Sequence, residues 1–138
     1  MRRFVDTNVL VYASDAAEPE KQRIARETLF AHASELVLSA QVLSELYVVL
    51  VRPSGLGMPP ADARAIVDDL RRFPILPIDD EMVLDAIDLS LREHTSYWDG
   101  LILATAQAGG CEVVLTEDLS HGTTIGGVRV ENPFFSVS

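Results

Sequence analysis

Two short hydrophobic segments of the chain each end at an aspartate. The segment at 4–5 leads into Asp6, and the segment at 113–115 leads through Thr116 to Asp118. Short segments rich in β-branched residues are typical of strands buried on both faces. Open α/β sheets bind ligands outside the carboxyl ends of their strands, so both aspartates could face one crevice. Carboxylates held close together repel each other unless a proton or cation intervenes, which favours Mg²⁺ or Mn²⁺ with oxygen ligands.

Two further carboxylates lie on predicted helices. Glu45 falls on or beside the apolar stripe of a helix expected at 40–52, where a glutamate costs free energy unless it is paired or coordinated. The alternatives for Glu45 are a residue at the edge of the stripe whose carboxylate extends to solvent, or a partner for an arginine. Asp99 lies one turn before the apolar residues of a helix expected at 97–108. The spacing Ser96-x-x-Asp99 equally fits a helix cap with an acid in the first turn.

Neutral polar residues accompany the acids at the strand ends. Thr7, Asn8 and Thr116 could orient a carboxylate or hydrogen-bond a metal-bound water, although turn and cap chemistry also explains them. Asp6 could likewise cap a short helix, and Asp118 could form an Asx turn. The joint pattern, two acids at strand ends and two on buried helix faces, favours one acidic cation site.

The elements that must position these residues alternate between strand and helix. Strands are predicted at about 3–6, 36–38, 75–78, 112–116 and 128–130, and helices at 8–14, 19–33, 40–52, 59–73, 79–93 and 97–108. Pro77 suggests an edge position for its strand. This alternation predicts an α/β fold, a three-layer α/β/α sandwich with a central, mainly parallel sheet.

Length and composition place the chain among ordinary globular domains. With 138 residues, 48% hydrophobic and 23% charged, we expect a single domain spanning 1–138. The single cysteine, Cys111, excludes an internal disulfide and is expected to be a small buried hydrophobe. The sequence shows neither a signal-peptide pattern nor an apolar stretch of transmembrane length, so we expect a cytoplasmic protein.

The formal net charge of −10 argues against a protein that coats nucleic acid by bulk electrostatics. It does not exclude a nuclease, because a metal-bound acidic site presents positive charge to a phosphate. Eleven Lys and Arg residues remain to line a groove. The acidity would also suit a basic partner protein, or simply a solvated surface.

Four segments of the sequence resemble the PIN-domain family, specifically its VapC-like toxins of bacterial type II toxin–antitoxin systems. The opening Phe-Val-Asp-Thr-Asn-Val-Leu at 4–10 is similar to the first strand and acid of that family. Ser-Glu-Leu at 44–46 resembles its second acid, and the segment 96–106 resembles the signature around its third. The segment 115–119 resembles the last motif. The resemblance covers essentially the whole chain, with the motifs in the family's order.

This resemblance implies a PIN-like fold and an endoribonuclease dependent on Mg²⁺ or Mn²⁺. The implied metal ligands and catalytic residues are Asp6, Glu45, Asp99 and Asp118. It further implies a homodimer, neutralised by a VapB-like antitoxin that inserts a segment, often with an arginine, into the acidic site. Many relatives have Asp-Phe in the last motif, whereas this chain continues Asp-Leu-Ser-His-Gly at 118–122. Glu117 therefore remains an alternative fourth acid.

Other residues have weaker claims to a role at the site. Arg52 and Arg92 could guide a phosphate backbone, although solvated residues at helix ends fit them equally. Trp98 could stack on a base or could be a packing or dimer contact. No catalytic role is expected for the three histidines.

Rival classes make different demands on the sequence. A phosphotransfer receiver would need a lysine after a late strand, but the only lysine, Lys21, lies in an early helix. A haloacid-dehalogenase-like phosphatase would need a second aspartate where this chain has Asn8. A catalytically silent module on the same fold, with an acidic pocket that receives a partner's basic segment, remains the alternative function. Metal binding and RNA turnover would separate it from a nuclease.

Overall fold

The computed structural model describes residues 1–137 as a six-stranded sheet flanked by helices. The strands are β1 (Arg3–Val5), β2 (Leu36–Ser39), β3 (Ile75–Leu76), β4 (Val113–Leu115), β5 (Thr124–Ile125) and β6 (Val128–Glu131). Their order across the sheet is β3-β2-β1-β4-β6-β5, and only the pairing of β5 with β6 is antiparallel. The predicted α/β class and the edge position of the strand before Pro77 are confirmed.

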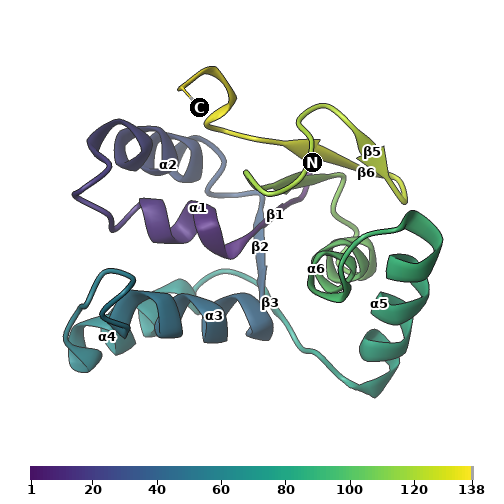
Figure 1. The fold of residues 1–138 in the computed structure, drawn as a ribbon, viewed down its shortest axis with the longest axis horizontal. Coiled ribbons are helices and arrows are strands. Elements are labelled where there is room, and N and C mark those ends of the chain that lie inside the picture. The colour runs from purple at the N-terminus through teal and green to yellow at the C-terminus, as the bar shows by residue number, and fades with distance from the viewer. Residues whose placement is uncertain (138) are drawn as a thin grey trace.

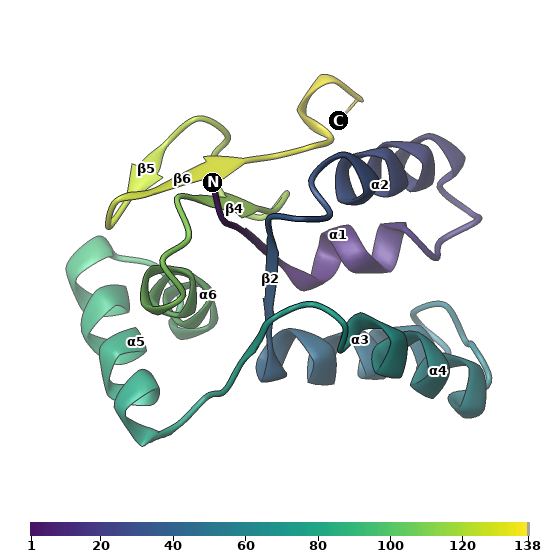
Figure 2. The same cartoon turned by 180° about the vertical axis from the view of Figure 1, so that it is seen from behind.

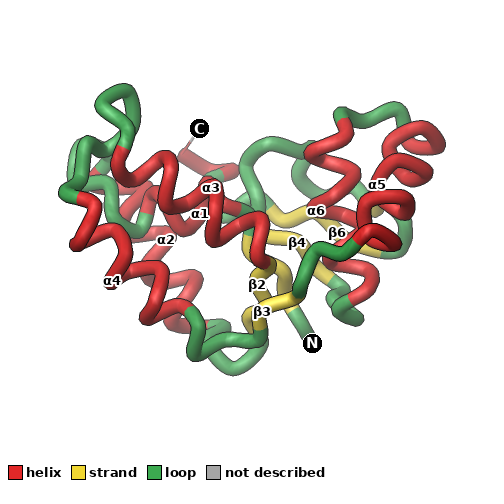
Figure 3. The backbone as a smooth tube through the Cα atoms, turned by 90° about the horizontal axis from the view of Figure 1, so that it is seen from below, coloured by secondary structure: helices red, strands yellow, loops and turns green. Residues whose placement is uncertain are grey.

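The helices form two groups on either side of the sheet. They are α1 (Thr7–Tyr12), α2 (Pro19–Ala31), α3 (Ala40–Val51), α4 (Pro60–Leu70), α5 (Asp80–Glu93) and α6 (Tyr97–Ala108), followed by a short 3₁₀ helix at Phe135–Val137. Helices α1 to α4 gather on one side, while α5 and α6 pack together on the other (Figures 1 and 2). Figure 3 shows the strands running between these groups. Within residues 1–137, no helix has the length and apolar character needed to cross a bilayer.

Local sequence signals explain where the helices begin. The side chains of Asp6, Ser39, Asp79 and Ser96 each accept a hydrogen bond from a backbone N–H in the first turn that follows. Such caps satisfy backbone donors that have no partner within the helix. Helix α2 instead begins at Pro19, whose fixed φ suits the first helical position. The three helices that follow or contain a candidate acid, α1, α3 and α6, therefore all begin at a side-chain cap.

The sheet core explains why the strands are nearly continuous apolar segments. Phe4 and Val5 of β1 and every residue of β2 and β4 are buried, as expected for parallel strands covered on both faces. Cys111 is buried at the start of the β4 segment, which confirms its predicted place.

The strand order creates a switch point between β1 and β4. From β1 the sheet extends through β2 to β3 on one side, and through β4 to β6 on the other. The backbone N–H of Asp6 donates to the carbonyl of Leu115 at 3.0 Å, which joins the two strand ends. Open α/β sheets bind ligands at such a point, beyond the carboxyl ends of the strands.

One hairpin was not predicted from the sequence. Strand β5 pairs with β6 through Gly126 and Gly127, whose φ angles of 58° and 81° are positive. Two consecutive positive φ values fit a type I′ hairpin turn, for which Gly-Gly is a favoured sequence. The Gly-Gly turn signal was therefore present in the sequence, but the two-residue strand before it was too short to show the alternation of side chains typical of a strand.

Gly100 allows α5 and α6 to approach closely. A Cβ built at Gly100 would lie 2.7 Å from the carbonyl oxygen of Ala86 and 2.9 Å from the Cβ of Ser90. We expect Gly100→Ala to destabilise the fold by about 1–3 kcal/mol through overpacking, measured by urea denaturation. Helix propensity alone would stabilise the variant by about 1 kcal/mol, so an increase in stability would contradict the tight contact.

Candidate functional site

Asp6 lies at the centre of the site because β1 ends there and α1 begins. Its side chain is only 7% exposed. One carboxylate oxygen, Oδ1, accepts a hydrogen bond from the backbone N–H of Thr7 at 2.7 Å, and Oδ2 accepts one from the Thr116 hydroxyl at 2.9 Å. Helix capping therefore does occur at Asp6, and it fixes the carboxylate at the switch point.

Thr116 directly follows β4, is buried, and makes three hydrogen bonds through its hydroxyl. While its hydroxyl donates to Asp6, its oxygen accepts from the side-chain amide of Asn8 at 3.1 Å and from the backbone N–H of Asp118 at 3.1 Å. Asn8 in turn accepts a hydrogen bond of 3.3 Å from the backbone N–H of Glu117. These bonds fix the loop after β4 against the start of α1, and the backbone N–H of Asp118 closes a turn on the Thr116 hydroxyl.

Glu45 reaches the site from the first half of α3. The Thr7 hydroxyl donates to its Oε2 at 2.9 Å, and Gln41 donates from Nε2 to its Oε1 at 2.8 Å. Each oxygen of an ionised carboxylate has two lone pairs, so both oxygens can accept a further partner. The half-buried glutamate is thus held in place by hydrogen bonds from Thr7 and Gln41, and no arginine among residues 1–137 pairs with it.

The acids act on one another electrostatically. Burial raises the pKa of Asp6 from 3.8 to about 6, and the charges of Asp118 and Glu45 add to this effect, against the hydrogen bonds from Thr116 and Thr7. The pKa of Asp118 is also raised, first by loss of hydration and then by the charges of Glu117, Asp99 and Glu45, against a hydrogen bond with Asn8. The structure therefore brings the predicted acids close enough for mutual repulsion, with Asp6 as the most perturbed.

Asp99 lies at the margin of this group. It occupies the first turn of α6, where the Ser96 hydroxyl accepts from the Asp99 backbone N–H at 3.1 Å. The capping interpretation is thus correct for Ser96, and it leaves the Asp99 carboxylate free to act on Asp118. Asp99 does not line the cleft that contains the other three acids.

A cleft of about 720 Å³ opens between α1 and α3 at this end of the sheet. Its acidic lining residues are Asp6, Asp15, Glu45, Glu117 and Asp118. Arg52 and the loop Ser54–Leu56 complete one wall. Arg92 is absent from the lining and lies 3.8 Å from Glu93, and Trp98 is likewise outside the lining. Of the two candidate arginines, only Arg52 can meet a ligand in the cleft.

Glu117 is engaged by neighbours on α1 and α2. Tyr12 donates a hydrogen bond of 2.7 Å from its hydroxyl to Oε1, and the Lys21 amine lies 3.2 Å from Oε2. Lys21 also lies 4.8 Å from the centre of the Tyr12 ring, a cation–π contact. Asp118, in contrast, acts directly on the pKa of Asp6. The geometry favours Asp118 over Glu117 as the fourth acid.

The donor set fits a hard divalent cation held partly through water. Within residues 1–137, no three His, Cys, Asp or Glu side chains converge closely enough to form a direct ligand set. Mg²⁺ typically keeps several waters and takes only one or two carboxylates directly. The buried Asp6, repelled by Asp118 and Glu45, is the carboxylate whose ionised form would gain most from a bound cation.

Three residues of the site were not identified from the sequence. Gln41 precedes Glu45 by four positions, a helical spacing at which side chains meet, so its contact could have been predicted. Tyr12 and Lys21 reach Glu117 across 105 and 96 positions, and no local pattern signals those contacts.

The fold and the cleft define an α/β domain with an acidic site at the switch point of a mainly parallel sheet. The chain belongs to the PIN domain family, whose sequence pattern matches residues 3–121. PIN domains are typically nucleases, and PIN nucleases generally use Mg²⁺. No curated protein sequence matches the chain.

Several solved structures share the fold. A toxin–antitoxin complex from Klebsiella pneumoniae has a TM-score of 0.72 and 23% sequence identity, over 95% of this chain and 97% of that one. DNA-bound VapBC from Salmonella typhimurium has a TM-score of 0.69 and 23% identity, over 96% and 98%. VapC20 of Mycobacterium tuberculosis, a sarcin-ricin loop cleaving toxin, has a TM-score of 0.63 and 19% identity, over 81% and 86%.

Proposed function

We propose that this protein is a metal-dependent endoribonuclease, the toxin of a type II toxin–antitoxin system. The observation that carries the proposal is the cleft at the switch point, where Asp6 is buried and electrostatically coupled to Asp118 and Glu45. Family membership supports a nuclease, and the similarity to toxin structures supports the toxin role. The resident ion is Mg²⁺ or Mn²⁺.

The residues divide the work of phosphodiester hydrolysis. Asp6 and Glu45 would hold the cation, kept in orientation by Thr116 and Thr7. When bound, the cation stabilises charge on the phosphate and lowers the pKa of a water. Asp118, exposed at the mouth of the cleft and with a raised pKa, would accept a proton from the attacking water. The negative charge of Asp99 raises the pKa of Asp118 and would thereby help Asp118 to hold this proton.

The chemistry predicts the ends of the products. Water attacks phosphorus in line with the leaving 3′ oxygen, so one fragment ends in a 3′ hydroxyl and the other begins with a 5′ phosphate. The 2′ hydroxyl takes no part, and RNA preference would come from the shape and accessibility of single strands. Arg52 on the cleft wall would contact the strand.

The test is cleavage of cellular RNA by the purified protein, free of any antitoxin, with Mg²⁺, Mn²⁺ or EDTA. Discrete fragments that require metal and carry 5′ phosphates would support the proposal. With the fold verified by circular dichroism, absence of cleavage in either metal would reject it and favour the silent module that receives a partner's basic segment.

We also propose a VapB-like antitoxin partner and a homodimer. Support comes from relatives crystallised with antitoxins, such as VapBC of Salmonella typhimurium. The acidic lining of the cleft suits a basic segment that neutralises it. Co-expression with a VapB-like antitoxin that binds the protein should suppress the RNA cleavage described above.

Thr116→Val is expected to lower metal affinity and cleavage about 10–100-fold, as for other losses of a ligand's supporting hydrogen bond. Valine keeps the shape of the fully buried side chain but removes the hydroxyl that donates to Asp6 and accepts from Asn8. Without that donor the pKa of Asp6 should rise further. Calorimetric Mg²⁺ titration measures the first effect, and Thr116→Ser, which keeps the hydroxyl, should stay near wild type. Equal affinities for the two variants would contradict this role.

A further inference from the structure

A second hollow, of about 400 Å³, lies apart from the acidic cleft and shares no lining residue with it. It is formed by His32 at the end of α2, His121 in the loop after β4, and Arg129 and Glu131 of β6. Its volume falls within the range typical of small-ligand sites. None of the candidate acids and none of the basic residues discussed above for the cleft lines this hollow.

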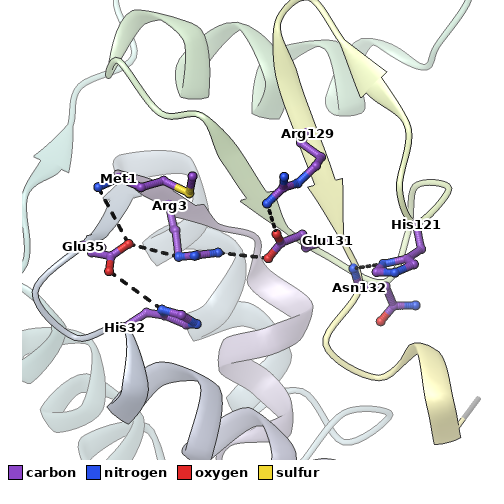
Figure 4. A network of polar contacts seen from close by, with 8 residues as sticks. All are labelled: Met1, Arg3, His32, Glu35, His121, Arg129, Glu131 and Asn132. Atoms are coloured by element: carbon purple, nitrogen blue, oxygen red, sulfur yellow. Dashed lines mark hydrogen bonds and ion pairs between the residues drawn. The ribbon is translucent and has the colours of Figure 1, made fainter.

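The single carboxylate that lines this hollow is already neutralised. Glu131 accepts a hydrogen bond of 2.9 Å from Arg3 through Oε2, and Arg129 pairs with its Oε1 (Figure 4). Arg3 also donates to Glu35 through Nε at 3.1 Å, so its guanidinium bridges the two carboxylates. Arg129 keeps its pair with Glu131 and can direct its remaining N–H donors to a ligand. The Arg129 side chain is 49% exposed, so those donors are accessible. A guanidinium of this kind suits a phosphate.

His121 contributes a donor of fixed position. Its Nδ1 accepts a hydrogen bond of 3.0 Å from the backbone N–H of Asn132, as Figure 4 shows. The ring proton therefore lies on Nε2, which is left as a donor. His121 also stacks on Phe135 with ring centres 4.4 Å apart, which holds the ring plane. The hollow thus differs from the cleft, because it offers hydrogen-bond donors from His121 and Arg129 and the carboxylate of Glu131 is already paired with arginines.

The two depressions flank one loop at the same edge of the sheet. Strand β6 runs parallel to β4, and the backbone N–H of Thr116 donates to the carbonyl of Glu131 at 3.1 Å. Asp118 lines the cleft, while His121 lines the hollow. Three residues of extended chain span at most about 10 Å, so one strand of RNA can reach both depressions.

We propose that the second hollow binds a phosphodiester group of the RNA strand outside the scissile position, with Arg129 and the Nε2–H of His121 as donors. The inference rests on the proposed ribonuclease function and extends it by a substrate subsite. In a chain with a net charge of −10, such a subsite would hold the strand where the protein surface otherwise repels it.

A metal-free binding experiment tests the location. The dinucleotide UpU, titrated in EDTA, should shift the imidazole proton resonances of His32 and His121. The third histidine, His94, caps α5 and lies outside the hollow, so it serves as an internal control. Shifts confined to His32 and His121 are expected. Resonances that remain unchanged at saturating UpU, or that move equally for all three histidines, would overturn the subsite.

Charge variants test its contribution to RNA binding. Arg129→Gln should weaken binding of a 12-nucleotide RNA in EDTA several-fold and reduce the slope of log affinity against log salt by about 0.7, the value for one lost phosphate contact on a single strand. Arg92→Gln removes the same charge from an exposed position outside the hollow and should leave that slope nearly unchanged. Equal slopes for the two variants would reject the subsite.

The subsite and the ribonuclease function can fail separately. Cleavage of the same RNA by the wild-type protein in Mg²⁺, together with equal slopes for the variants, would leave the ribonuclease and remove the subsite. Absence of cleavage, together with a slope reduced only in Arg129→Gln, would remove the ribonuclease and leave a phosphodiester-binding site.

Discussion

RNA cleavage by the Asp6→Asn protein is expected to fall at least about a thousandfold, a barrier increase of about 4 kcal/mol. The substitution keeps the size of the side chain, and asparagine is a good helix cap, so α1 should still begin at the same residue. What is lost is the negative charge at the most buried point of the cleft. A neutral amide compensates the charge of a divalent cation poorly, so the cation and its effect on the phosphate are lost together.

Asp15→Asn provides the matched control for this result. Asp15 lines the same cleft, and its replacement removes the same unit of charge. Its Oδ1 accepts from the backbone N–H of Ala17, so its structural role is in the connection between α1 and α2. Initial rates on a defined RNA at saturating Mg²⁺ should be near wild type for Asp15→Asn. Comparable rates for the two variants would show that Asp6 has no special place in the reaction.

The position of Asp6 could be predicted because the signals that set it are local. An apolar strand of β-branched residues must be buried, and the aspartate that follows caps the next helix. Glu45 could be predicted for a similar reason, since the helical period alone places it beside the buried stripe of α3. Strand β5 was missed because two residues carry no period, although Gly126 and Gly127 marked the turn.

The choice between Glu117 and Asp118 could not be made from the sequence. The two acids are consecutive in a loop, where no helical or strand periodicity indicates which side chain faces Asp6. The structure turns Glu117 toward Tyr12 and Lys21, and these contacts join segments about a hundred residues apart. The second hollow could not be predicted from the sequence for the same reason, since Arg3 and Glu131 are in contact although 128 positions separate them. Contacts of this kind follow from the strand order, which the sequence pattern left open.

In EDTA, the free energy of unfolding is expected to fall by about 3 kcal/mol between roughly pH 4 and pH 6 because of Asp6 alone. The folded protein raises the pKa of this carboxyl from 3.8 to about 6, chiefly through burial. Within that window the folded state keeps a proton that the unfolded chain releases. The contribution of Asp6 is therefore most favourable below pH 4 and is lost as the pH rises through 6. Asp118, whose pKa is also raised, acts in the same direction.

Urea unfolding at a series of pH values, with and without Mg²⁺, measures this linkage. The Asp6→Asn protein should lose most of the fall between pH 4 and pH 6 and keep only the part due to Asp118, whereas Asp15→Asn should keep the whole fall. At neutral pH a saturating cation should restore stability to the wild type, by about 2.7 kcal/mol at a hundred times its dissociation constant. The cation should stabilise Asp6→Asn far less, because the carboxylate whose repulsion it relieves is gone. If the stability of the wild-type protein in EDTA does not fall across this window, the raised pKa of Asp6 is contradicted. If both variants respond equally to Mg²⁺, Asp6 is not the carboxylate that binds the cation.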